Sequence, residues 1–183
     1  MASFFSGYSQ TAQDHLGIPG PVVYDQLIYN LAWSALPTKI YFKQEYLPSG
    51  SDTVHFDRMI LIEAVEGDYK LEDVVDLKVT ELKEMQKKNP VVNFAVFNNP
   101  DKTEYIVDFI LSRGKKRLNL IEWNAYKYKL FVDSSGRKGV QLFGVCFRDT
   151  NDITAFFNAL PDLRKKELKK LISYPMPNIQ PGN

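Results

Sequence analysis

Two carboxylates in predicted strands are the first residues that could do chemistry. Asp108 falls between Ile106 and Ile110 in the alternation of an apolar segment, and Glu122 lies in the next segment along the chain. A carboxylate covered by aliphatic side chains either finds hydrogen-bond donors or rises in pKa, as a catalytic acid does. The two acids could then form the acid–base pair of a hydrolase. The interpretation we prefer leaves Asp108 on the solvent side of its strand.

Histidine and cysteine add little to this chemistry. His15 and His55 lack the partner three or four residues away that a helical metal pair needs, so we predict no metal site. Cys146 lies in an apolar strand, where a buried thiol is inert. No nucleophile elbow, phosphate-binding glycine loop or dinucleotide fingerprint occurs in the sequence. We therefore expect no cofactor, and an enzyme is the less favoured class.

Charge is distributed unevenly along the chain, although the net charge is only +1. Residues 1–112 carry 9 basic and 16 acidic side chains, whereas residues 113–183 carry 14 basic and 6 acidic ones. Cations interleaved with tyrosines could contact the phosphates and bases of a single-stranded nucleic acid. Turn tips and outer helix faces are ordinarily solvated, so nucleic-acid binding is only an alternative hypothesis. Its candidate residues are Arg113, Lys115, Lys116, Arg117, Lys127, Lys129, Arg137 and Lys138.

The elements that must position these side chains include one long amphipathic helix. From Leu71 to Lys88, apolar residues recur at steps of three and four, with polar residues between them. Acidic residues come early in this segment and basic residues come late, as the helix dipole favours. Pro90 prevents the helix from continuing.

Short segments rich in aromatic and β-branched residues predict six antiparallel strands joined by polar turns. The strands are expected at 38–47, 58–65, 91–97, 104–112, 118–132 and 140–148. In 118–132 the apolar side switches near Glu122 to Asn124, which predicts a bulge. The apolar residues of 22–35 fit neither the helical period nor the alternation of a strand well. We interpret this segment as a short helix followed by an extended piece.

The remaining segments complete the predicted domain. One helix is expected through 153–160, and a further helix is expected to begin at Pro161, since proline suits a first helical turn. The domain is placed at 21–173, between a flexible leader at 1–20 and a Pro-rich tail at 174–183. The expected fold class is α+β, with an antiparallel sheet of about six strands and helices packed over it as an αβα sandwich.

Three of these strands resemble successive strands of the PsbP-like superfamily. They are VDFILS at 107–112, IEWNAYKYK at 121–129 and GVQLFGVCFRD at 139–149. The superfamily includes extrinsic subunits of photosystem II, a Ran-binding nuclear-transport factor and bacterial envelope proteins. By the order of elements the resemblance covers roughly residues 37–173. It implies a sandwich that binds or scaffolds rather than catalyses.

The preferred hypothesis is therefore a non-catalytic protein-binding or assembly domain that recognises a protein partner through an exposed surface. Aromatic residues make up 13% of the chain, and interfaces use those that lie outside the core. Tyr8, Trp33 and Trp123 are the candidate contact residues, although Trp123 also suits the core.

Signals for a compartment are weak. No apolar run reaches the ~20 residues that cross a bilayer, so we expect no transmembrane segment. The sequence begins without the basic and apolar regions of a signal peptide. Taken as it stands, the chain is expected in the cytoplasm, but a native start upstream of Met1 would favour a periplasmic or secreted envelope protein.

Overall fold

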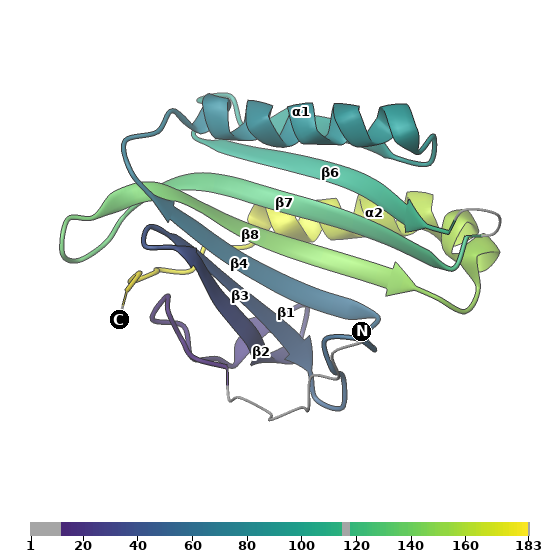
Figure 1. Cartoon of the computed structure of the whole chain (residues 1–183), viewed down its shortest axis with the longest axis horizontal. Coiled ribbons are helices and arrows are strands. Elements are labelled where there is room, and N and C mark those ends of the chain that lie inside the picture. The colour runs from purple at the N-terminus through teal and green to yellow at the C-terminus, as the bar shows by residue number, and fades with distance from the viewer. Residues whose placement is uncertain (1–11, 115–117, 183) are drawn as a thin grey trace, which may run out of the picture.

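In the part of the chain that the structure describes, eight antiparallel strands form one sheet that curls from edge to edge (Figure 1). The computed structural model describes residues 12–114 and 118–182. The strand order across the sheet is β1-β2-β3-β4-β8-β7-β6-β5. In chain order the strands are β1 (Val22–Tyr24), β2 (Leu27–Thr38), β3 (Tyr41–Pro48), β4 (Arg58–Glu66), β5 (Asn93–Asn98), β6 (Glu104–Arg113), β7 (Leu120–Val132) and β8 (Lys138–Asp149).

The central strands are apolar on both sides because a helix packs against each face of the sheet. In β8, Val140 and Leu142 join the core beneath α1 (Leu71–Lys88), whereas Phe143 and Val145 join the core beneath α2 (Ile153–Ser173). Successive residues of a strand point to opposite faces, so a strand covered on both sides reads as a nearly continuous apolar run.

Helix α1 has the limits that its pattern predicts, which confirms the expected helix. It buries Leu71, Val75 and Leu82 against β6 and β7. The side-chain amide of Gln86 donates to the carbonyl of Val92 at 2.9 Å, which fixes the end of α1 beside the start of β5.

Helix α2 is one helix instead of the two that were expected. The carboxylate of Asp152 accepts a hydrogen bond from the backbone N–H of Ala155 and caps its start. Pro161 lies inside the helix and does not begin a new one. Leu171, near the end of α2, is completely buried in the core on that side of the sheet.

The six-stranded α+β sandwich predicted from the sequence is wrong. The described residues form an eight-stranded curled sheet with two helices. Residues 22–35, interpreted as a short helix followed by an extended piece, instead form β1, a turn at Asp25 and Gln26, and most of β2, so only the extended piece is confirmed. The predicted bulge is also wrong, because β7 pairs with β6 and β8 without a break through Glu122 and Asn124. The apolar side only seemed to switch there because both faces of β7 are covered. Register shifts occur in β2 instead, on either side of Trp33 to Ala35.

Packing extends beyond the predicted 21–173 at both ends. Leu16 and Ile179 are buried in the α2-side core. The backbone N–H of Gln180 donates to the carbonyl of Leu16 at 2.7 Å, and that of Gly182 donates to the carbonyl of His15 at 2.9 Å. Within the described ranges, neither helix has the length and apolar character that crossing a bilayer requires.

Candidate ligand-binding groove

The register of the sheet brings polar and aromatic side chains together on the α1 side. Residues directly opposed in antiparallel strands share a face, so each register row can be followed from strand to strand. One row runs from β3 to β7 through Lys43, Glu63, Leu142 and Tyr128. The row beside it begins on β2 and consists of Trp33, Glu45, Leu61, Gly144 and Tyr126.

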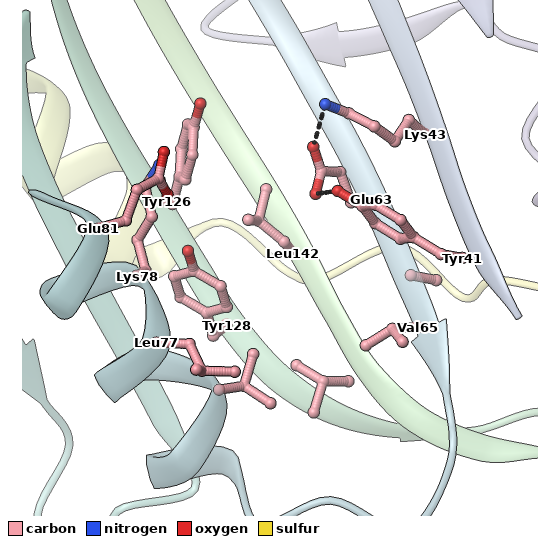
Figure 2. A pocket seen from close by; sticks show the side chains of 13 residues that line it. Tyr41, Lys43, Glu63, Val65, Leu77, Lys78, Glu81, Tyr126, Tyr128 and Leu142 are labelled. Carbon is pink, nitrogen blue, oxygen red and sulfur yellow. Dashed lines mark hydrogen bonds and ion pairs between the residues drawn. The ribbon is translucent and has the colours of Figure 1, made fainter. Parts of the chain in front are cut away.

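Helix α1 covers only part of this face, and a groove of about 500 Å³ remains between the helix and the β3–β4 side of the sheet (Figure 2). Val65, Val140 and Leu142 form an apolar floor. Val74 and Leu77 line the groove from α1, and Leu77 is 72% exposed at its mouth.

Glu63 forms a closed polar cluster at the sheet side of the groove. One carboxylate oxygen accepts a hydrogen bond from the hydroxyl of Tyr41 at 2.5 Å, and the other lies 3.0 Å from the ammonium nitrogen of Lys43. Burial, followed by the nearby charge of Glu63, raises the pKa of Tyr41. The phenol therefore stays protonated at neutral pH and acts as a donor.

A second polar cluster lies further along the same face. Arg148 donates from Nε to a carboxylate oxygen of Glu122 at 2.6 Å, and its guanidinium stacks on Phe56 at 3.7 Å from the ring centroid. Burial raises the pKa of Glu45, although the positive charges of Lys43 and Arg148 oppose this shift. Burial also raises the pKa of the Cys146 thiol, so this cysteine stays protonated, as predicted for an inert buried thiol.

On the α1 side of the groove, Lys78 and Glu81 form a third polar cluster, an ion pair within the helix. The ammonium nitrogen of Lys78 lies 2.9 Å from a carboxylate oxygen of Glu81. The same nitrogen lies 4.8 Å from the ring centroid of Phe109 and 5.5 Å from that of Tyr126, which is cation–π distance. The two ion pairs that line the groove, Lys43–Glu63 and Lys78–Glu81, thus leave it with no net charge.

Two tyrosines supply the free polar groups of the groove. Tyr126 and Tyr128 line it, and their hydroxyls make no hydrogen bond to any residue within the described ranges. Burial raises the pKa of both phenols, so both remain neutral. Gly144 makes room for the Tyr126 ring, since a Cβ at this position would lie 2.8 Å from Cδ1 of that ring.

The two carboxylates singled out from the sequence do not form a pair. Asp108 opposes Ala125 on the α2 side, whereas Glu122 lies on the α1 side. The preferred solvent-side placement of Asp108 is wrong, because the residue is only 2% exposed. Its carboxylate binds the guanidinium of Arg164 through both oxygens and accepts a hydrogen bond from the indole of Trp123. These contacts make Asp108 part of a structural ion pair.

The aromatic residues proposed as partner contacts lie in different places. Trp33 is 40% exposed on β2, in the row that continues through Glu45 towards Tyr126. Trp123 is buried in the α2-side core, which leaves it no access to a partner. Tyr8 lies outside the described residues.

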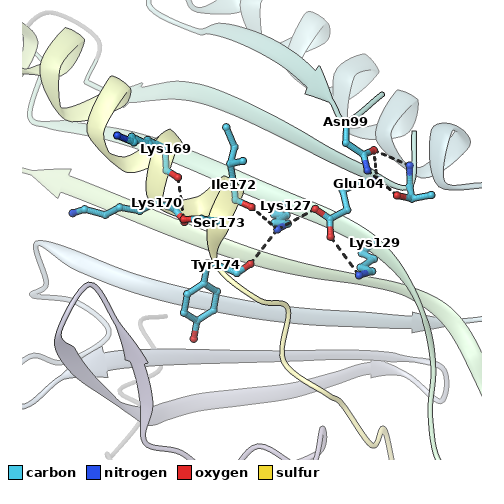
Figure 3. A network of polar contacts seen from close by, with 10 residues as sticks. Asn99, Glu104, Lys127, Lys129, Lys169, Lys170, Ile172, Ser173 and Tyr174 are labelled. Carbon is cyan, nitrogen blue, oxygen red and sulfur yellow. Dashed lines mark hydrogen bonds and ion pairs between the residues drawn. The ribbon is translucent and has the colours of Figure 1, made fainter. Parts of the chain in front are cut away.

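The basic residues of the nucleic-acid hypothesis are largely occupied by carboxylates. Lys127, expected on the water side of its strand, is buried between Glu104 and the end of α2 (Figure 3). Three further residues of the set also form ion pairs: Lys129 with the same Glu104, Arg137 with Asp133 and Glu66, and Lys138 with Asp68. Arg113 is exposed at the end of β6, and Lys115, Lys116 and Arg117 lie outside the described residues.

Sequence reasoning missed Tyr41, Glu63 and Lys78, which together define the groove. A signal was present in the two strands before α1. Glu63 lies between Ile62 and Ala64, and Lys43 and Glu45 are two positions apart on β3, so charged residues recur on one face of these strands, as expected for a sheet face that remains partly open to water.

Comparison with known proteins places most of the chain in one family. The model of an uncharacterised protein family matches residues 16–176, which include every described strand and helix. No curated protein and no solved structure matches the chain.

Proposed function

The chain belongs to the family whose model spans residues 16–176, and from the groove that these residues build we propose a non-catalytic binding domain for a small amphipathic ligand. The observation that carries this proposal is the pair of free tyrosine hydroxyls above an apolar floor. A volume of about 500 Å³ suits a small molecule, since ligand sites usually measure ~300–1,000 Å³.

The ligand class follows from the lining. The apolar floor of Val65, Val140 and Leu142 favours an aliphatic or aromatic body. Tyr126 and Tyr128 can each donate or accept one hydrogen bond, which favours a ligand with one or two uncharged polar groups. In both ion pairs that line the groove, each charge is already neutralised by its partner. A ligand with a net charge would therefore have to displace one of these partners to find a counter-charge.

The non-catalytic part of the proposal rests on the state of the nearby reactive groups. Both oxygens of Glu63 are engaged by Tyr41 and Lys43, so this acid is not free to act as a base. The thiol of Cys146 is kept protonated by burial. Nucleophilic catalysis needs a nucleophile beside a base that can activate it, and neither residue meets that requirement.

A fluorescence titration with N-phenyl-1-naphthylamine tests the proposal. This probe is uncharged, has an apolar body and carries a single N–H group, so it should brighten on entering the groove with micromolar affinity. Changing Leu77 to Glu places a charge at the mouth without disturbing the core. We expect the Leu77→Glu protein to bind the probe about tenfold more weakly than the unaltered protein.

Leu36→Glu is the matched control, because Leu36 is also exposed but lies on β2 outside the groove. Its affinity for the probe should stay within about twofold of the unaltered protein. A further variant, Tyr128→Phe, keeps the ring and removes one hydroxyl, and it should bind the probe about threefold more weakly because one hydrogen-bonding group of the groove is lost. No brightening with the unaltered protein, or equal losses in the two leucine variants, would refute the groove as the binding site.

A further inference from the structure

The two edges of the sheet differ in how they are protected against pairing with another strand. At one edge, β1 is only three residues long. At the other edge, β5 is six residues long, continuous in register and free of charge and proline, with the sequence NFAVFN. Val96 and Phe97 in this strand are 41% and 42% exposed. Short edges, charges, prolines and bulges normally prevent edge-to-edge association, and β5 has none of them.

We propose that β5 pairs with β5 of a second copy of this chain, forming a two-fold symmetric dimer with one continuous sheet. Two antiparallel edge strands of identical chains can be related only by a two-fold axis perpendicular to the sheet. Such an axis, near Ala95 or Val96, keeps both copies of α1 on the same side of the joined sheet. The two helices then run in opposite directions on either side of the axis.

The charges of α1 fit this arrangement. Glu72, Asp76, Lys83 and Lys87 follow one another at steps of four, seven and four, so they share one side of the helix. This is the side towards β5 and β6, because Glu72 accepts a hydrogen bond from Tyr105 on β6 and Gln86 reaches Val92 before β5. The groove lies on the opposite side of α1, along Val74, Leu77 and Glu81.

A two-fold axis that passes beside the middle of α1 brings acidic residues of one copy opposite basic residues of the other. It places Asp76 of one copy towards Lys83 of the other, and Glu72 towards Lys87, each pair arising twice. Within the parts of the chain that the structure describes, Asp76 and Lys83 form no ion pair. Glu72 and Lys87 have exposed partners, Lys102 and Glu84, which dimerisation could supplement. This axis lies at about the same level as the one in β5, because Gln86 near the end of α1 contacts Val92 just before β5, and Glu72 near its start contacts Lys102 just after β5.

The interface is expected to be weak. A stable complex usually buries ~800 Å² on each partner. Pairing along one six-residue edge strand, together with the charged side chains of α1, buries a smaller area. We therefore expect a dimer with a micromolar dissociation constant, whose charged part weakens with salt.

Sedimentation velocity across a micromolar dilution series tests whether the chain dimerises through β5. The unaltered protein should shift from monomer to dimer as concentration rises, and Val96→Lys should remain monomeric. Val23→Lys is the matched control, because Val23 is an exposed valine on the opposite edge strand, β1. It should dimerise like the unaltered protein. A monomer at every concentration, or unchanged dimerisation of a folded Val96→Lys protein, would overturn the proposal.

Charge exchange tests the orientation and does not depend on the Val96 variant folding. Asp76→Lys and Lys83→Asp should each dimerise more weakly alone, since each places like charges opposite one another. An equimolar mixture of the two variants should associate, because one chain then carries two positive charges and the other two negative charges. The double variant Asp76→Lys/Lys83→Asp should recover the affinity of the unaltered protein. Absence of association in the mixture would rule out the proposed arrangement of α1.

Discussion

Replacing Lys127 with alanine should lower the free energy of unfolding by about 3 kcal/mol, because it leaves buried acceptors without their donor. The ammonium nitrogen lies 3.1 Å from a carboxylate oxygen of Glu104 (Figure 3). It also donates to the carbonyls of Ile172 and Tyr174, each at 3.1 Å, where α2 ends. Burial alone would raise the pKa of Glu104, but hydrogen bonds from Lys127 and Lys129 outweigh it and lower that pKa. Urea unfolding followed by circular dichroism measures the loss.

Lys129→Ala is the natural control for this change. Lys129 lies two residues further along β7 and pairs with the other oxygen of Glu104 at 3.3 Å, but its side chain is 45% exposed. An exposed ion pair contributes only about 0–1 kcal/mol. Lys127→Met retains the aliphatic stem and should recover part of the loss. Equal destabilisation by Lys127→Ala and Lys129→Ala would contradict the role assigned to Lys127.

Replacing Arg164 with leucine should also destabilise the fold by about 3 kcal/mol, since it leaves the carboxylate of Asp108 buried without a counter-charge. The value is at the lower end of what a buried pair shows, because the Arg164 side chain is 41% exposed. Trp123 would remain as a single donor, through its indole N–H at 3.3 Å. Chemical denaturation of the purified variant measures the change.

A double-mutant cycle with Asp108→Asn separates the charge from the packing of Arg164. The asparagine keeps an acceptor for Trp123 and removes the negative charge. In this background, Arg164→Leu should cost less than about 1 kcal/mol, because no uncompensated charge remains. The same cost in both backgrounds would show that Arg164 acts through its contacts alone and that the ion pair contributes nothing.

Local patterns predicted α1 well because every signal for this helix lies within it or directly after it. Its apolar period, the order of its charges and the terminating Pro90 are all close in sequence. Strands β5 to β8 were located for a similar reason, since polar turns separate them. Residues 22–35 were misread because a strand on a curled outer part of the sheet buries few side chains, so its alternation is weak.

The environment of individual side chains could not be predicted in this way. Arg164, which lies 56 residues away on α2, neutralises the charge of Asp108, and no local sequence pattern predicts that contact. Lys127 alternates with tyrosines as a solvated residue would, yet the end of α2 covers it. The groove likewise depends on β3, β4 and β7 meeting beneath α1, which is decided by sheet order and not by any one segment.

The sheet order has a consequence for how the chain reaches its folded state. Apart from β4 and β8, the neighbouring strands of the described sheet follow one another in sequence. Two meanders, β1–β4 and β5–β8, can therefore form from hairpins with short loops, whereas pairing Arg58 with Phe147 must close a much larger loop. The groove depends on this long-range pairing, because Val65 in its floor lies on β4 whereas Val140 and Leu142 lie on β8.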